Sequence, residues 1–119
     1  MITSISFYDG AAEGFFHGMM LGLVASLSSK YYIRSNRESG QGRFDIQLEP
    51  KDKGLPGILM EFKAVSSSEK DKLPELAEDA LGQTKDRNYA RDLEERGISD
   101  IVRYGIAFSG KNVEVRVER

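Results

Sequence analysis

A short run over residues 57–63 constrains the fold of this chain most strongly, because it places two charges within core-like apolar residues. The run reads Gly-Ile-Leu-Met-Glu-Phe-Lys. Side chains of a β-strand point alternately to the two faces of a sheet, so Glu61 and Lys63 share one face while Met60 and Phe62 share the other. Charges in such a strand are usually paired, bound to a metal or used in chemistry.

A second charged strand precedes this run. Asp45 lies sixteen residues before Glu61, within the segment Arg-Phe-Asp-Ile of residues 43–46. Residues 49–57 between the two strands are rich in proline, glycine and charged side chains, which is the composition of a turn. We therefore expect the two strands to form an antiparallel hairpin.

The register of this hairpin decides whether the charges meet. If Leu48 pairs with Ile58, Asp45 falls opposite Glu61, with the two side chains about 5 Å apart. The same register puts Arg43 opposite Lys63. A shift by one residue would instead place Asp45 opposite an apolar side chain. The first register brings two carboxylates within reach of one cation.

Composition sets limits on the protein class. The 119 residues, with 39% hydrophobic and 30% charged side chains, predict one globular domain over residues 1–119. The absence of cysteine excludes disulfides and thiolate metal sites, and it suits the cytoplasm. The apolar stretch of residues 15–27 is too short for a bilayer span, so we expect no membrane partner. A net charge of −2 means that any nucleic-acid surface must be local or bridged by metal.

The remaining pattern predicts an α/β fold with a mixed central sheet flanked by helices. The expected order is α-β-β-β-α-β-β. Its elements are a helix over 11–29, a strand at 31–33, a polar turn at 35–40, strands over 43–48 and 57–63, a helix from 69 or 74 to 96, a strand over 101–108, a turn at 109–112 and a strand over 113–118. Gly97 is expected to cap the second helix at its C-terminal end.

Several segments, read in this order, resemble the PD-(D/E)XK nuclease superfamily. They are Asp45, the triplet Glu61-Phe62-Lys63, Gln83, and the segments 38–45 and 104–111. The resemblance implies a restriction-endonuclease-like α-β-β-β-α-β core. Within the superfamily, the sequence is closer to the bacterial group usually found C-terminal to an AAA-ATPase-like domain. The chain is therefore either a stand-alone protein or an excised domain. An ATPase domain or partner is expected. The Pro-Asp dipeptide of the superfamily is replaced here by Phe44-Asp45.

The resemblance also implies a function, which is Mg²⁺-dependent (or Mn²⁺-dependent) hydrolysis of phosphodiester bonds in DNA, with RNA as an alternative substrate. Lys63 would orient the attacking water or stabilise developing charge, and Gln83 would position water or phosphate. The metal ligands implied are Asp45, Glu61, the backbone carbonyl of Phe62, and Glu13. The candidate phosphate contacts are Arg43, Ser39 and Lys85.

Other interpretations of these residues stay open. The Asp-Glu-Lys cluster is also compatible with a cross-strand salt bridge, and Glu13 with a favourable charge in the first turn of a helix. His17 is either a hydrogen-bond partner of Glu13 or a polar break in a buried helix, and Gln83 suits an exposed helix position. Two rival functions follow: a non-catalytic binding module of an ATPase-associated system, and a homodimeric, resolvase-like enzyme for branched DNA.

Overall fold

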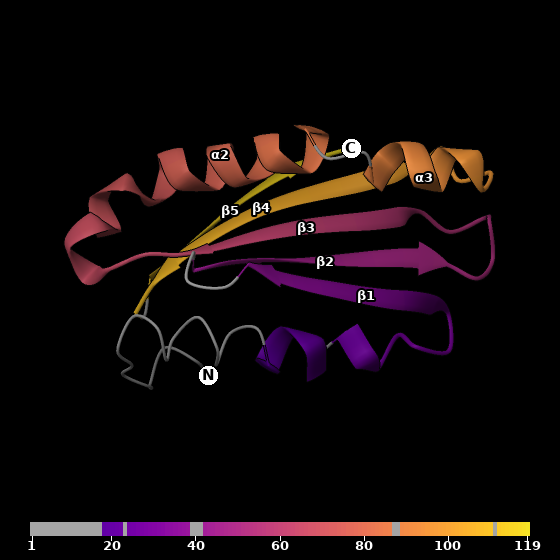
Figure 1. Ribbon diagram of the computed structural model, residues 1–119, viewed down its shortest axis with the longest axis horizontal. Helices are drawn as coiled ribbons and strands as arrows, with labels where there is room; N and C mark the ends of the chain where they lie inside the picture. The colour runs from indigo at the N-terminus through magenta and orange to yellow at the C-terminus, as the bar shows by residue number, and fades with distance from the viewer. Residues whose placement is uncertain (1–17, 23, 39–41, 87–88, 111) are drawn as a thin grey trace.

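The computed structural model describes residues 18–22, 24–38, 42–86, 89–110 and 112–119. Three residues considered above, Glu13, His17 and Ser39, lie outside these ranges. The described part of the chain forms a five-stranded sheet with helical segments on both of its faces (Figure 1).

The sheet is mixed, as the sequence predicts. Its strands follow one another in chain order: β1 (Tyr31–Glu38), β2 (Arg43–Pro50), β3 (Gly57–Ala64), β4 (Ile101–Ser109) and β5 (Asn112–Glu118). All neighbouring pairs are antiparallel except β3 and β4, which are parallel. A parallel pair requires a long crossover, and the helices between residues 67 and 95 supply it.

The polar turn expected at residues 35–40 is wrong for residues 35–38. Ser35 pairs with Ile46 and Asn36 with Asp45, so β1 continues to Glu38. Serine and asparagine have a low strand propensity, but pairing with a neighbouring buried strand outweighs that preference. As a result, β1 runs beside the whole length of β2.

The single helix expected up to residue 96 is also wrong. In its place the structure has the 3-10 helix η2 (Ser67–Lys72), followed by α2 (Leu73–Asp86) and α3 (Tyr89–Glu95). The two α-helices bury side chains in different clusters: Ala77 of α2 packs with Ala107, whereas Leu93 of α3 packs with Leu59. Both helices lie on the same face of the sheet (Figure 1). None of the helices in the described ranges is long and apolar enough to cross a membrane.

The predicted C-cap of the second helical region is confirmed at the end of α3. Gly97 has a φ of 88°, in the left-handed region that favours glycine. Its N–H donates to the carbonyl of Glu94 at 3.0 Å, and the N–H of Ile98 donates to the carbonyl of Leu93 at 2.9 Å. This pair of bonds is a Schellman motif, which turns Ile98 back into the same cluster as Leu93.

The opposite face of the sheet holds the main core. Phe44 and Phe62 stack with ring centroids 4.4 Å apart, and Phe108 is tilted against Phe44 at 6.4 Å. Val24, from the N-terminal helical segment, closes this cluster from outside the sheet. Since side chains alternate along each strand, the neighbours of these aromatic residues, including Asp45, face α2 and α3 instead.

Gly82→Ala is expected to stabilise the protein by about 0.5–1 kcal/mol. Gly82 lies within α2, and a Cβ built there meets nothing within 4 Å. Alanine lowers the conformational entropy of the unfolded chain and favours the helix without creating a clash. Urea unfolding should show a higher midpoint with an unchanged slope. A lower midpoint would contradict the packing of α2 described here.

Candidate active site

The predicted hairpin register is confirmed. Asp45 lies directly opposite Glu61 across β2 and β3, and Arg43 lies opposite Lys63. Leu48 pairs with Ile58, as expected from the turn between the strands. The four charged side chains therefore share the sheet face that α2 and α3 cover.

The two carboxylates are buried. Asp45 is 3% exposed and Glu61 is 1% exposed. Burying a charge is costly unless an opposite charge or a hydrogen bond compensates for it. The guanidinium of Arg43 supplies part of this compensation, because its Nη2 lies 4.0 Å from Oε2 of Glu61. Lys63, half-buried, follows two residues later on the same face.

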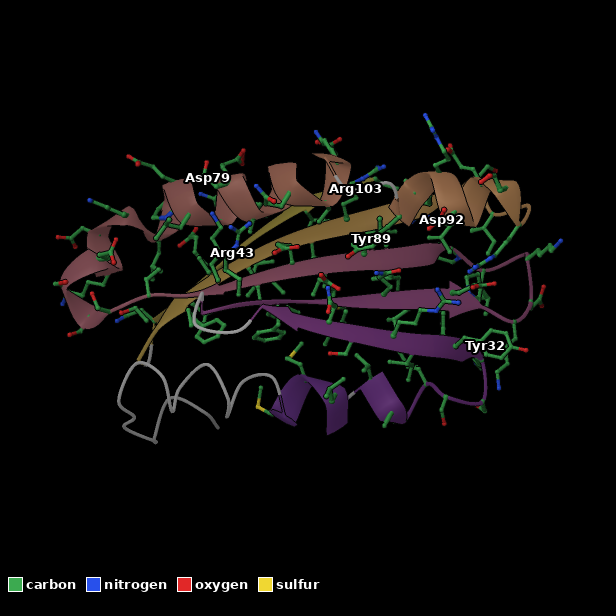
Figure 2. The ribbon with its side chains drawn as sticks, in the orientation of Figure 1. Tyr32, Arg43, Asp79, Tyr89, Asp92 and Arg103 are labelled. Carbon is green, nitrogen blue, oxygen red and sulfur yellow. The ribbon has the colours of Figure 1, made fainter. Side chains whose placement is uncertain are left out.

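Tyr89 belongs to the site and was missed by the sequence analysis. It is the first residue of α3, and its hydroxyl donates to Oδ2 of Asp45 at 3.3 Å. Figure 2 shows Tyr89 and Arg43 between the helices and the sheet. The contact joins residues 44 positions apart in the chain, one on α3 and one on β2.

Gly105 positions the helix beside the carboxylates. It is the β4 neighbour of Glu61 and faces α2. A Cβ built on Gly105 would overlap the backbone oxygen of Ala77 and the backbone nitrogen of Leu81, and would lie 2.8 Å from Cα of Leu81. The absence of a side chain therefore lets the α2 backbone rest directly on the strand next to Glu61.

The other predicted site residues within the described ranges are Gln83, Phe62 and Lys85. Gln83 is half-buried on α2, one residue before the buried Thr84. The ring of Phe62 lies in the opposite core, so this residue can reach the site only through its backbone. Lys85 is exposed near the end of α2, and its Nζ lies 2.7 Å from Oε1 of Glu118 on the edge strand β5. Its role as a phosphate contact stays a prediction.

A groove lies between α3 and the strands β1 and β2, next to Tyr89, whose hydroxyl contacts Asp45. Gln47 follows Asp45 by two positions on the same face of β2, and it pairs with Arg34 of β1. Tyr32 is 58% exposed at the far end. The lining residues are Tyr32, Arg34, Gln47, Glu49, Tyr89, Asp92, Leu93 and Arg96. Figure 2 labels Tyr32, Tyr89 and Asp92 along this path.

Comparison with known families agrees with this geometry. A family model of the PD-(D/E)XK nuclease superfamily matches residues 11–118. The chain belongs to the PD-(D/E)XK nuclease superfamily. The fold expected from the resemblance, an α/β restriction-endonuclease-like core, is thereby confirmed. Membership points to a nuclease-type activity on nucleic acid. A search of curated proteins finds no match to the chain.

The motif of the PD-(D/E)XK superfamily can be read directly on these strands. Glu61, Phe62 and Lys63 on β3 fit its D/E-X-K part, and Asp45 on β2 fits the aspartate of its Pro-Asp part, with Phe44 in the proline position. Phe44 instead serves the opposite core by stacking on Phe62. The substitution therefore changes a packing position and leaves the aspartate in place.

The candidate metal ligands of this site suit the divalent metals that PD-(D/E)XK nucleases typically use. Within the described ranges, no three histidine, cysteine, aspartate or glutamate side chains group together as a metal site. Asp45 and Glu61 offer two carboxylates on adjacent strands. A hard cation such as Mg²⁺ binds through one or two carboxylates and keeps several waters, so this oxygen pair suits it.

Proposed function

We propose that this protein is a divalent-metal-dependent nuclease that hydrolyses phosphodiester bonds in DNA. One observation carries the proposal: Asp45 and Glu61 lie opposite each other on adjacent strands, both nearly fully buried, with Lys63 following on the same face. Membership of a nuclease superfamily supports the same reaction class. Burial of two opposed carboxylates beside one guanidinium is costly for a purely structural arrangement.

Asp45 and Glu61 would hold the metal, Mg²⁺ or Mn²⁺, between β2 and β3. The backbone carbonyl of Phe62 and the side chain of Glu13 are the proposed additional ligands. When bound, the cation would supply Lewis-acid polarisation of the scissile phosphate and activation of water. The helices above the carboxylates exclude bulk solvent, which strengthens electrostatic interactions inside the site.

Lys63 would stabilise the negative charge that develops on the phosphate and help to orient the attacking water. Its ammonium is a compact point charge, which suits a site beside two carboxylates. Gln83 would position water or a phosphate oxygen from α2 through its amide group. These two roles require no movement of the strands.

Substrate contacts would be local, because the net charge of −2 provides no general attraction for DNA. Arg43, beside Glu61, and Ser39 are the proposed phosphate contacts. The groove toward Tyr32 and Arg34 is the proposed path of the strand away from the cleaved bond, since an exposed aromatic ring can stack on a base. Lys85 is the third proposed phosphate contact, and a phosphate would compete there with its exposed ion pair to Glu118.

Cleavage of a panel of labelled substrates tests the proposal. Single-stranded DNA, duplex DNA, four-way DNA and single-stranded RNA would each be incubated with Mg²⁺, Mn²⁺ or EDTA. We expect metal-dependent cleavage of DNA. Binding without cleavage of any substrate would favour a non-catalytic module, and cleavage confined to four-way DNA would favour a resolvase-like enzyme. Cleavage of RNA alone would replace the proposed substrate.

Metal binding is expected to raise the melting temperature of the wild-type protein. A ligand that binds only the folded state, at a free concentration of about 100 times its Kd, stabilises that state by about 2.7 kcal/mol. Asp45→Asn should abolish this shift. Without metal, the Asp45→Asn variant should unfold at the same temperature as wild type or at a higher one. The reason is that the substitution removes one of two opposed buried negative charges.

Thermal unfolding with and without Mn²⁺ measures both effects. Asp79→Asn is the matched control, because Asp79 is an exposed aspartate on α2 (labelled in Figure 2). This control should keep the full metal-induced shift. If Asp45→Asn also kept it, Asp45 would be removed from the metal site.

The cellular setting is proposed on composition and resemblance alone. The absence of cysteine suits a reducing compartment, and we propose the cytoplasm. An ATPase domain or partner is proposed from the bacterial group that the sequence resembles. Fractionation and affinity capture of the full-length protein from its own cells would test both.

A further inference from the structure

The edge strand β5 leaves an apolar stripe open. Val113, Val115 and Val117 share one face of this strand and are 45%, 45% and 56% exposed. Among the strands of the described residues, β5 pairs with β4 alone, so its other side is an edge of the described sheet. β5 contains no proline, and its charged side chains Glu114 and Arg116 lie on the α2 side, so the N–H and C=O groups along its edge can pair with another strand.

We propose that two copies of this chain associate through β5, antiparallel and centred on Val115. The pairing would join the two sheets into one continuous sheet of ten strands, five from each copy. A two-fold axis through Val115 makes the contact self-complementary, as in most homodimers. This inference does not rest on the proposed nuclease activity.

The backbone geometry of β5 permits this register. Ser109 and Asn112 pair across the turn that joins β4 to β5. In an antiparallel pair the hydrogen-bonding direction alternates from residue to residue. Counting from Asn112, the N–H and C=O groups of Val113, Val115 and Val117 point away from β4. With the two-fold axis at Val115, these N–H and C=O groups can form hydrogen bonds with the corresponding groups of the same three valines in the second copy.

The side chains select the same register. A two-fold axis at Val115 places Glu114 of each copy opposite Arg116 of the other copy. It also places valine opposite valine at each position whose N–H and C=O groups point away from β4. Centring on residue 114 would place Glu114 opposite itself. Centring on residue 116 would place Arg116 opposite itself and Glu114 opposite Glu118. Of these three registers, only the first places Glu114 opposite Arg116.

The charged side chains of β5 lie on the α2 side of the sheet. Glu114 and Arg116 face α2, where Arg116 lies 3.4 Å from Glu78 and 2.6 Å from Glu114. These ion pairs are partly exposed, so a second Glu114 can join them. The two-fold axis is perpendicular to the sheet, so the α2 helices and the buried carboxylates of both copies face the same side.

Disulfide trapping tests the register, because the natural chain has no cysteine. Hydrogen-bonded antiparallel residues have Cα atoms about 5.5 Å apart, within the usual disulfide range. Val115→Cys should therefore form a covalent dimer on oxidation. Val113→Cys alone should not, because the two cysteines would be roughly 13 Å apart. A mixture of Val113→Cys with Val117→Cys should cross-link.

These outcomes decide the proposal. If Val115→Cys forms no more covalent dimer than Ser67→Cys, an exposed position on η2, the proposal is overturned. If Val113→Cys alone cross-links as well as Val115→Cys, the proposed register is overturned. Melting temperatures of the reduced variants would show that each is folded.

Charge reversal provides an independent measurement. Sedimentation equilibrium of wild type should show dimers, and Glu114→Arg should raise the dissociation constant on the order of tenfold, because two attractive cross-strand pairs become repulsive. The double variant Glu114→Arg with Arg116→Glu should restore the dimer. A wild type that is monomeric at every concentration would overturn the proposal.

Discussion

Gly105→Ala is expected to lower the free energy of unfolding by about 3 kcal/mol. The new Cβ would overlap the backbone of α2 at Ala77 and Leu81. These two residues are four apart, the spacing that one α-helical hydrogen bond joins. A helix backbone cannot rotate away as a side chain can, so the whole of α2 must shift from the sheet.

Urea unfolding of Gly105→Ala would be compared with Gly57→Ala. A Cβ at Gly57 lies 3.0 Å from Cδ1 of Leu93 and 3.3 Å from Cγ2 of Ile98, both of which belong to flexible side chains. We expect this control to cost far less. An equal midpoint for Gly105→Ala and wild type would show that α2 does not rest on β4 beside Glu61.

Lys63→Ala is expected to lower the rate of DNA cleavage by about 10²–10³ while leaving metal binding intact. Lys63 lies on the same sheet face as the carboxylates but is not itself a proposed ligand. Its loss would remove electrostatic stabilisation of the transition state, which lowers kcat more than it changes KM.

Single-turnover cleavage, together with the Mn²⁺-induced shift in melting temperature, separates these two effects. Lys70→Ala is the matched control, because Lys70 is an exposed lysine on η2. A normal rate for Lys63→Ala would remove this residue from the chemistry. A lost melting-temperature shift would instead indicate that Lys63 supports the metal site.

The hairpin that carries the site could be predicted because its determinants are local. Alternation sets which side chains share a face, and a turn rich in proline and glycine joins two adjacent strands. A shift by one residue would place Asp45 opposite an apolar side chain, and the structure instead has the expected register with Leu48 opposite Ile58. The C-cap at Gly97 could be predicted for the same reason, since glycine marks the left-handed position.

The features that were missed depend on contacts between distant segments. Tyr89 reaches Asp45 only because α3 packs through Leu93 onto a cluster of its own. The close approach at Gly105 depends on where α2 crosses β4, which no local pattern reveals. The ion pair of Lys85 with Glu118 likewise joins α2 to the last strand.

The most direct test of the central claim is metal-dependent DNA cleavage by wild type beside Asp45→Asn. Both proteins would be incubated with labelled DNA and Mn²⁺ at the same concentration, after thermal unfolding has shown that both are folded. The proposed site predicts cleavage by wild type that EDTA abolishes, and none by Asp45→Asn. Equal cleavage by the two proteins would contradict a nuclease centre built on Asp45 and Glu61.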